Sequence, residues 1–188
     1  SLYVSRTGFT NELGFEIYPD GLKTNHLALW DHLVKCGKPH GMEFSPTRAM
    51  TIRRIEGGIF GNLTDIDTTM TPFEAGLEFF VNMEKGDFIG RDALIDKDRR
   101  PCLFGLTCKT ETPVSGSKVM DGKSIVGHMT AGIQSPTLQM GIGYVRFYQP
   151  NDWVGRELTI QLPDGSSHKA DIVNLPFFDH EKKIVKGI

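Results

Sequence analysis

The first apolar and polar positions of the chain predict a short strand behind a polar loop. The alternating run Phe15-Glu16-Ile17-Tyr18 follows a loop that is bracketed by two glycines. Successive side chains of a strand point to opposite faces, so Glu16 and Tyr18 share one face while Phe15 and Ile17 share the other. The pattern therefore places a carboxylate and a phenol ring side by side.

Two later stretches have sequence signals that are typical of helices. Apolar side chains recur every three or four residues from Leu27 to Val34, which predicts an amphipathic helix over residues 24–36. A second helix is expected to begin at Ser45, an N-cap residue followed by a proline, and to end at Gly57. Its charged face is expected to meet water, a ligand or another domain.

The middle of the chain predicts a short helix, an extended run and a domain boundary. Thr71-Pro72-Phe73-Glu74 is a capping box that predicts a short helix, and the apolar run 77–83 is expected to be extended. The run 96–101 consists of five charged residues followed by a proline, which is typical of a linker. We therefore expect domains at residues 1–98 and 99–188.

Short strand patterns recur at regular intervals beyond residue 101. The predicted strands are 102–108, 124–130, 141–148, 157–162 and 168–174. Asp164-Gly165 between the last two predicts a hairpin. Regular strands without helical spacing favour a small β-barrel or sandwich. The predicted fold class is α+β, a mixed α/β portion followed by a small C-terminal β-barrel.

The composition of the chain limits the kinds of binding partner and the cellular compartment that we expect. The chain has 188 residues, of which 39% are hydrophobic and 23% charged, as in ordinary globular proteins. A net charge of −2 and basic residues clustered only in pairs argue against nucleic-acid and membrane-surface partners. The three cysteines lack CxxC spacing, which favours reduced thiols and a cytoplasmic location, with Cys102 and Cys108 in the core.

The strand with Glu16 and Tyr18 is the main candidate for chemistry. A carboxylate beside an aromatic ring suits a flat heteroaromatic ligand that donates two N–H bonds. The alternative is that both side chains line the solvated face of a half-buried strand. Asp65 and Asp67 lack the other oxygen ligands of a calcium loop, so we expect no metal there. The sequence contains no GxSxG, P-loop or GxGxxG motif.

Several blocks along the chain form a further, more specific pattern. They are SRTGFTNELGFE (5–16), RIEGG (54–58), PFEAGL (72–77), KGDFIGR (85–91), GHMTAG (127–132), SPTL (135–138), GYV (143–145) and PF (176–177). In this order they resemble the glycine-cleavage T-protein (aminomethyltransferase) family and its folate-dependent relatives. The resemblance covers nearly the whole chain.

The resemblance implies a tetrahydrofolate site. The glutamate that anchors the pterin in the family falls on Glu16, and the aromatic residue that packs on the folate falls on Phe9. Tyr18 matches a tyrosine of the dimethylsulfoniopropionate demethylase branch. Arg48 is the candidate for the folate tail, although Met50 falls nearer to the family's arginine.

The resemblance also implies an activity, which is transfer of a one-carbon unit to N5 of tetrahydrofolate. The unit is a methylene from an aminomethyl donor or a methyl from a sulfonium or amine. Departures at Met50 and near Ser115 favour a relative with different substrate chemistry. The alternatives are the folate module of a sarcosine or dimethylglycine dehydrogenase and a non-catalytic folate-binding protein.

The resemblance places the catalytic acidic residue in an N-terminal half that precedes the matching region. The chain begins without a methionine, at a point that resembles the middle of a strand. We therefore expect a fragment that needs that N-terminal half as its partner and is inactive alone.

Overall fold

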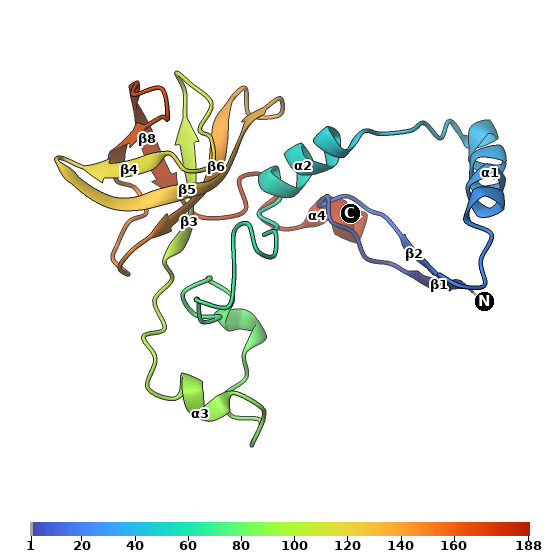
Figure 1. Ribbon diagram of the computed structural model, residues 1–188, viewed down its shortest axis with the longest axis horizontal. Coiled ribbons are helices and arrows are strands. Elements are labelled where there is room, and N and C mark those ends of the chain that lie inside the picture. Colours follow the sequence, from blue (N-terminus) through green and yellow to red (C-terminus); the bar gives the residue numbers. More distant parts are fainter. Residues whose placement is uncertain (1) are drawn as a thin grey trace. The chain divides into compact units, whose positions relative to one another are not determined.

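A computed structural model describes residues 2–188 of the chain (Figure 1). Contacts divide the chain into two compact units. The first comprises the described residues up to Arg54 together with Glu181–Ile188, and the second is Ile55–His180. The domain boundary predicted between residues 98 and 99 lies inside the second unit and stays a prediction.

The first unit contains a two-stranded ribbon and a helix. Strands β1 (Leu2–Ser5) and β2 (Glu16–Pro19) are antiparallel, with Ser5 opposite Glu16. Helix α1 (His26–Gly37) begins where the Asn25 side chain accepts a 3.0 Å bond from the Ala28 amide. The strand predicted at 15–18 and the helix predicted at 24–36 are therefore confirmed within one or two residues.

The remaining elements of this unit are short or charged. They are the 3-10 turn η1 (Lys38–His40), all but the last two residues of helix α2 (Thr47–Glu56), and α4 (Lys183–Lys186). Helix α2 confirms the helix predicted between Ser45 and Gly57.

The first unit buries no apolar side chain among its described residues. Among these residues only Asn11 is buried, at 4% exposure. On α1, Leu27 is 70% exposed and Trp30 is 49% exposed. The amphipathic pattern of α1 is present, but its apolar face has no covering layer within this unit.

The second unit begins with a segment of turns. The capping box forms as predicted, because the Thr71 amide donates to the Glu74 carboxylate at 2.7 Å and the Glu74 amide donates to the Thr71 hydroxyl at 3.1 Å. The predicted helix is wrong, however, since the chain makes one turn and then reaches Gly76 at φ +71°. The turn ends at Gly76, which adopts the left-handed conformation. The Leu77 amide donates a hydrogen bond to the Pro72 carbonyl and closes the turn.

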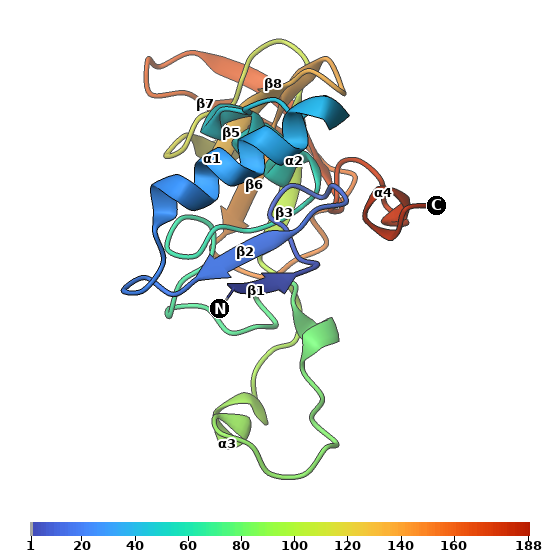
Figure 2. The same ribbon diagram turned by 90° about the vertical axis from the view of Figure 1, so that its right-hand side faces the viewer.

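The run expected to be extended after this turn is also different. It contains the 3-10 turn η2 (Glu78–Phe80). The chain then passes through helix α3 (Arg91–Leu94) before it enters the barrel. Figure 2 shows the segment that carries α3 as a loop outside the barrel wall.

Six strands form a closed antiparallel barrel, in the order β3-β6-β5-β4-β7-β8. They are β3 (Leu103–Cys108), β4 (Lys118–Asp121), β5 (Ser124–Ser135), β6 (Met140–Phe147), β7 (Glu157–Gln161) and β8 (Ser167–Val173). The five predicted strands and the hairpin at Asp164-Gly165 are confirmed. The short strand β4 was not predicted, and β5 runs five residues beyond its expected end at residue 130.

Apolar side chains fill the barrel. Leu106, Val119, Met129, Val145 and Ile160 are all fully buried at 0% exposure. Burial of one such side chain stabilises the fold by about 1.5–3 kcal/mol. The Trp153 ring stacks on Phe147 with centroids 4.1 Å apart. Cys102 and Cys108 are buried, at 5% and 1%, as expected of core residues.

Across residues 2–188, the helices are all too short or too polar to span a lipid bilayer.

Candidate functional site

The carboxylate of Glu16 is the centre of a small polar cluster on the β1–β2 ribbon. Tyr18 donates its hydroxyl hydrogen bond to Oε2 of Glu16 at 2.7 Å, and the Thr7 hydroxyl donates to the same oxygen. Tyr18 therefore shares the face of Glu16, as the alternating pattern predicted. The bonds from Thr7 and from Tyr18 hold the pKa of Glu16 below its ordinary value, and partial burial opposes them.

The carboxylate keeps acceptor capacity for a ligand. Both hydroxyl donors reach Oε2, and Oε1 of Glu16 accepts no hydrogen bond from any residue between 2 and 188. An ionised carboxylate has about four acceptor sites, so roughly two remain. The lowered pKa of Glu16 favours its ionised form, and Oε1 can accept up to two N–H hydrogen bonds.

The loop before β2 is held by cations from two other segments of the same unit. Arg53 donates from Nε to Oε1 of Glu12 at 2.8 Å, and its Nη2 donates to the same oxygen. Lys182 donates to the amide oxygen of Asn11 at 2.8 Å. The Arg54 guanidinium lies 5.9 Å from the centre of the Phe9 ring. These contacts fix a loop that has no apolar core of its own.

A small cavity opens beside this loop. Its volume is about 160 Å³. It is lined by Arg6, Thr7, Gly8, Glu12, Leu13, Gly14 and Val185. Thr7 belongs both to this cavity and to the Glu16 cluster. Ligand pockets usually measure about 300–1,000 Å³, so this cavity can receive only the edge of a ligand.

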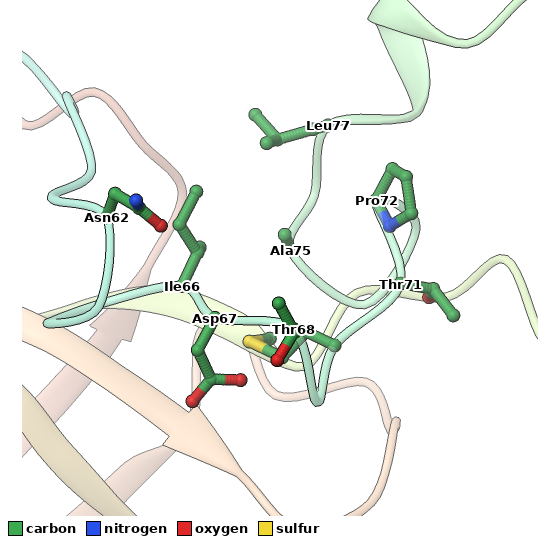
Figure 3. Close-up of a pocket in the computed structure, with 9 residues that line it drawn as sticks. Asn62, Ile66, Asp67, Thr68, Thr71, Pro72, Ala75 and Leu77 are labelled. Carbon is green, nitrogen blue, oxygen red and sulfur yellow. The ribbon is translucent and has the colours of Figure 1, made fainter.

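A larger pocket lies in the second unit, beside the turn that follows the capping box. Figure 3 shows Ile66, Ala75 and Leu77 on its walls, and its volume is about 290 Å³. Asp67 also lines it, but its carboxylate pairs with Arg146 at 3.2 Å. The hydroxyl and amide of Thr69, and then Arg146, hold the pKa of Asp67 below its ordinary value. This pocket therefore offers an apolar surface and a charge that is already neutralised.

The acidic residues considered for calcium hold the loop together instead. Asp65 accepts from the Gly61 amide at 2.7 Å and from the Thr130 hydroxyl at 2.8 Å. Within residues 2–188 there is no group of three or more His, Cys, Asp and Glu side chains placed to hold a metal ion.

Glu56 is a fully buried carboxylate at the end of α2. It accepts hydrogen bonds from the Ser135 hydroxyl at 2.5 Å and the Thr137 hydroxyl at 3.0 Å. The Thr137 amide donates a further bond of 3.3 Å. The carboxylate therefore joins the RIEGG block to the SPTL block, which lie far apart in the sequence.

Two family models match the chain, one on each side of residue 98. The GCVT N-terminal domain matches residues 1–85, and the glycine cleavage T-protein C-terminal barrel domain matches residues 101–179. The chain belongs to the glycine cleavage T-protein family. The resemblance drawn from the sequence blocks is confirmed.

Individual relatives agree with this assignment. An aminomethyltransferase of Alkaliphilus oremlandii is 35% identical over an alignment of 186 residues that covers 96% of this chain and 49% of the relative. An aminomethyltransferase of Caldanaerobacter subterraneus is 33% identical over an alignment of 187 residues that covers 96% of this chain and 48% of the relative. The chain thus spans about half the length of these relatives.

A solved structure shows the same fold. The crystal structure of the glycine cleavage system aminomethyltransferase T from Bartonella henselae matches with a TM-score of 0.80 and 26% identity. The match covers 95% of this chain and 50% of that one. The predicted class, a mixed α/β portion followed by a C-terminal barrel, is confirmed for this member of the T-protein family.

The ligand roles expected from the T-protein resemblance remain predictions, but the structure locates each residue. Glu16 and Tyr18 are in contact, and Phe9 is 36% exposed under Arg54. Arg48 is exposed on α2, and its side chain makes no hydrogen bond or ion pair with residues 2–188. Thr7 was not predicted, because only the fold of the loop shows that its hydroxyl reaches Glu16.

Proposed function

We propose that this chain binds tetrahydrofolate through Glu16 and serves an enzyme that transfers a one-carbon unit to that cofactor. The observation that carries the proposal is the Glu16 carboxylate of a T-protein family member. Thr7 and Tyr18 hold one of its oxygens, while the other accepts no bond from residues 2–188. The open acceptor oxygen fits the edge of a reduced pterin, which presents an amino group and a ring N–H as donors.

Glu16 acts in this proposal as an anchor rather than as an acid or a base. Its lowered pKa keeps it ionised, so it accepts hydrogen bonds and does not donate a proton. Tyr18 and Thr7 orient the carboxylate. Phe9 supplies a ring for packing, and Arg48 supplies a cation for the anionic tail of the ligand.

The chain's contribution to the reaction is positioning. Bound tetrahydrofolate supplies N5 as the acceptor of the one-carbon unit. Holding two reactants in line can supply roughly 7–11 kcal/mol of a reaction barrier. Residues that fix the pterin edge therefore act on the rate through alignment. The names of the relatives support an aminomethyl group as the donor.

A methyl donor, as in the folate-dependent demethylases, is the second candidate. Two observations favour it. Tyr18 stands beside Glu16, where the demethylase branch also has a tyrosine, and Met50 stands near the place of an arginine in T-proteins. Assays with an aminomethyl donor and with a sulfonium or methylamine donor would separate the two candidates.

Transfer requires more polypeptide than this chain. The aminomethyltransferases above are about twice as long, and the acidic residue that orients the reactants is expected in the part that this chain does not span. We propose that the chain alone does not catalyse one-carbon transfer. Efficient one-carbon transfer by the 188-residue chain would contradict this.

Calorimetric titration with tetrahydrofolate tests the binding site. It is run on the chain alone and on the chain mixed with the remaining segment of the Alkaliphilus oremlandii enzyme. Glu16→Gln is expected to weaken binding by about 1–3 kcal/mol, because the amide can accept only one of the two N–H bonds. Glu84→Gln, an exposed site in the second unit, is the matched control. Unchanged affinity in Glu16→Gln removes the assignment, as does absence of binding in both conditions.

A further inference from the structure

A further cavity of the second unit lies beside the loop that joins β6 to β7. Its volume is about 350 Å³, within the range of about 300–1,000 Å³ that is usual for small-molecule pockets. We call it the Trp153 cavity. None of its lining residues lines the two cavities described above or belongs to the Glu16 cluster. Among them are Arg100, Phe104, Asp152, Trp153 and Val154.

The apolar wall of this cavity is made of side chains that the barrel core holds in place. Trp153 is 5% exposed and Phe104 is 9% exposed. The Trp153 indole N–H donates to the Gln149 carbonyl at 3.1 Å, so it needs no acceptor from a ligand. Phe147 and Arg156 already lie over the indole ring. Trp153 therefore offers a ligand an apolar contact surface and no free polar group.

Two charged side chains line the cavity, and one of them is already neutralised. Arg100 donates from Nε and Nη2 to the Asp98 carboxylate, at 3.1 Å and 2.7 Å. These side-chain bonds from Arg100 lower the pKa of Asp98 to about 2. The Asp152 carboxylate accepts no hydrogen bond and forms no ion pair with residues 2–188. The rim of the cavity therefore carries one uncompensated negative charge.

An apolar cavity with one unpaired carboxylate at its rim suits a particular class of ligand. The apolar wall favours a hydrocarbon body, because burial removes apolar surface from water. The carboxylate favours an ammonium group, which donates charge-assisted hydrogen bonds. An anion would be repelled by Asp152, and Arg100 offers little compensation because its charge is shared with Asp98.

We propose that the Trp153 cavity binds a small organic cation, an amine carried on an aromatic or aliphatic body. The body contacts Phe104, Trp153 and Val154, and the ammonium group pairs with Asp152. Asp152 is exposed, so the ion pair adds selectivity for a cation while the apolar body supplies most of the affinity. The site is separate from the Glu16 cluster and does not rest on the folate assignment.

A fluorescence titration of the 188-residue chain tests the proposal. The chain has two tryptophans, so Trp30→Phe leaves Trp153 as the reporter. The probes are phenethylamine, which is a cation at neutral pH, and phenethyl alcohol, its neutral counterpart. Phenethylamine is expected to change the Trp153 emission saturably, with a Kd of about 1 mM. Phenethyl alcohol is expected to bind about 3-fold more weakly.

Two substitutions in the Trp30→Phe background locate the site. Asp152→Asn is expected to weaken phenethylamine binding about 3-fold and to leave phenethyl alcohol binding unchanged, which a general loss of structure would not do. Val154→Arg, at a position that is 43% exposed, puts a cation at the rim and is expected to weaken phenethylamine binding about 10-fold or more. Asp87→Asn, exposed elsewhere in the second unit, is the matched control. Circular dichroism verifies that each variant keeps its fold.

Four results would overturn the inference. The first is no saturable change in emission up to about 10 mM phenethylamine, and the second is equal affinity for the two probes. The third is equal affinity of Asp152→Asn and Asp87→Asn for phenethylamine. The fourth is a dimer in sedimentation whose formation alone shifts the Trp153 emission, since a second copy of the chain would then occupy the cavity. Glu16→Gln is expected to leave the amine titration unchanged, so the failure of the folate proposal and the failure of this one are distinguishable.

Discussion

The Tyr18 hydroxyl donates a 2.7 Å hydrogen bond to the carboxylate of Glu16, two residues earlier on the same strand. The pair is a direct consequence of the two-residue repeat of a strand, which puts both side chains on one face. Thr7 adds a second hydroxyl donor from the loop. The carboxylate is therefore oriented before any ligand binds, which lowers the cost of recognition.

The titration of Glu16 is the first prediction. Its pKa in the folded chain is expected below the ordinary value of 4.5, because Thr7 and then Tyr18 stabilise the ionised form. Carboxyl carbon NMR measures the midpoint. Thr7→Val is expected to raise the pKa more than Tyr18→Phe, since the Thr7 bond is the larger cause. Equal midpoints in all three proteins would contradict the cluster.

The sign of the pH dependence follows from the same shift. A group whose pKa is depressed by folding stabilises the fold at pH values above its unfolded pKa. That contribution is lost as the pH falls through the lower, folded pKa of Glu16. The ribbon is thus expected to loosen in acid, at a pH below 4.5, and less so in Thr7→Val.

Glu56 gives the second prediction, on stability. Glu56→Gln keeps the volume but offers one acceptor oxygen where Ser135 and Thr137 donate to two. The loss of a buried charge-assisted bond is expected to lower the free energy of unfolding by about 1–3 kcal/mol. Urea denaturation followed by far-UV circular dichroism measures it. Glu84→Gln, which is exposed, is expected to stay within about 0.5 kcal/mol.

Much of the fold followed from local pattern. The strand at 15–18, the two main helices and five of the six barrel strands were predicted because each has its own period or its own end signals, such as Ser45 and Asp164-Gly165. The contact of Tyr18 with Glu16 followed from the same rule. In these places the local preference and the tertiary structure agree.

The errors and omissions lie where distant residues decide the structure. The capping box predicted a short helix that ends near Gly76, but the chain makes only one turn before the left-handed Gly76. Strand β4 has only four residues and too little pattern to be found alone. The burial of Glu56 could not be foreseen, since its partners come from residues 135 and 137.

Thiol reactivity gives the third prediction. Cys36 is exposed, whereas Cys102 and Cys108 are buried. Burial, and next the neighbouring Glu74, raise the pKa of Cys102, which keeps the unreactive thiol form. A chromogenic disulfide reagent is therefore expected to modify one thiol per folded chain and three after denaturation. Cys36→Ser should remove the fast reaction, and two fast thiols would show an opened barrel.

Gly143 gives the fourth prediction, and it separates packing from ligand binding in the GYV block. On β6 it lies opposite Gly132 of β5 and Leu106 of β3. A Cβ there would collide with the backbone oxygen of Ala131, which cannot move aside as a flexible side chain could. Gly143→Ala is therefore expected to lower the free energy of unfolding by about 1–3 kcal/mol or more.

Gly21→Ala is the matched control for this substitution. A Cβ at Gly21 would meet nothing within 4 Å, and its φ is not in the left-handed region. It is expected to change stability by no more than about 0.5 kcal/mol. If Gly143→Ala unfolds at the same urea concentration as Gly21→Ala, strands β5 and β6 can accommodate a methyl group at this position. The glycine of the block would then need a reason other than the close approach of β5 and β6, and contact with a ligand would be the first to test.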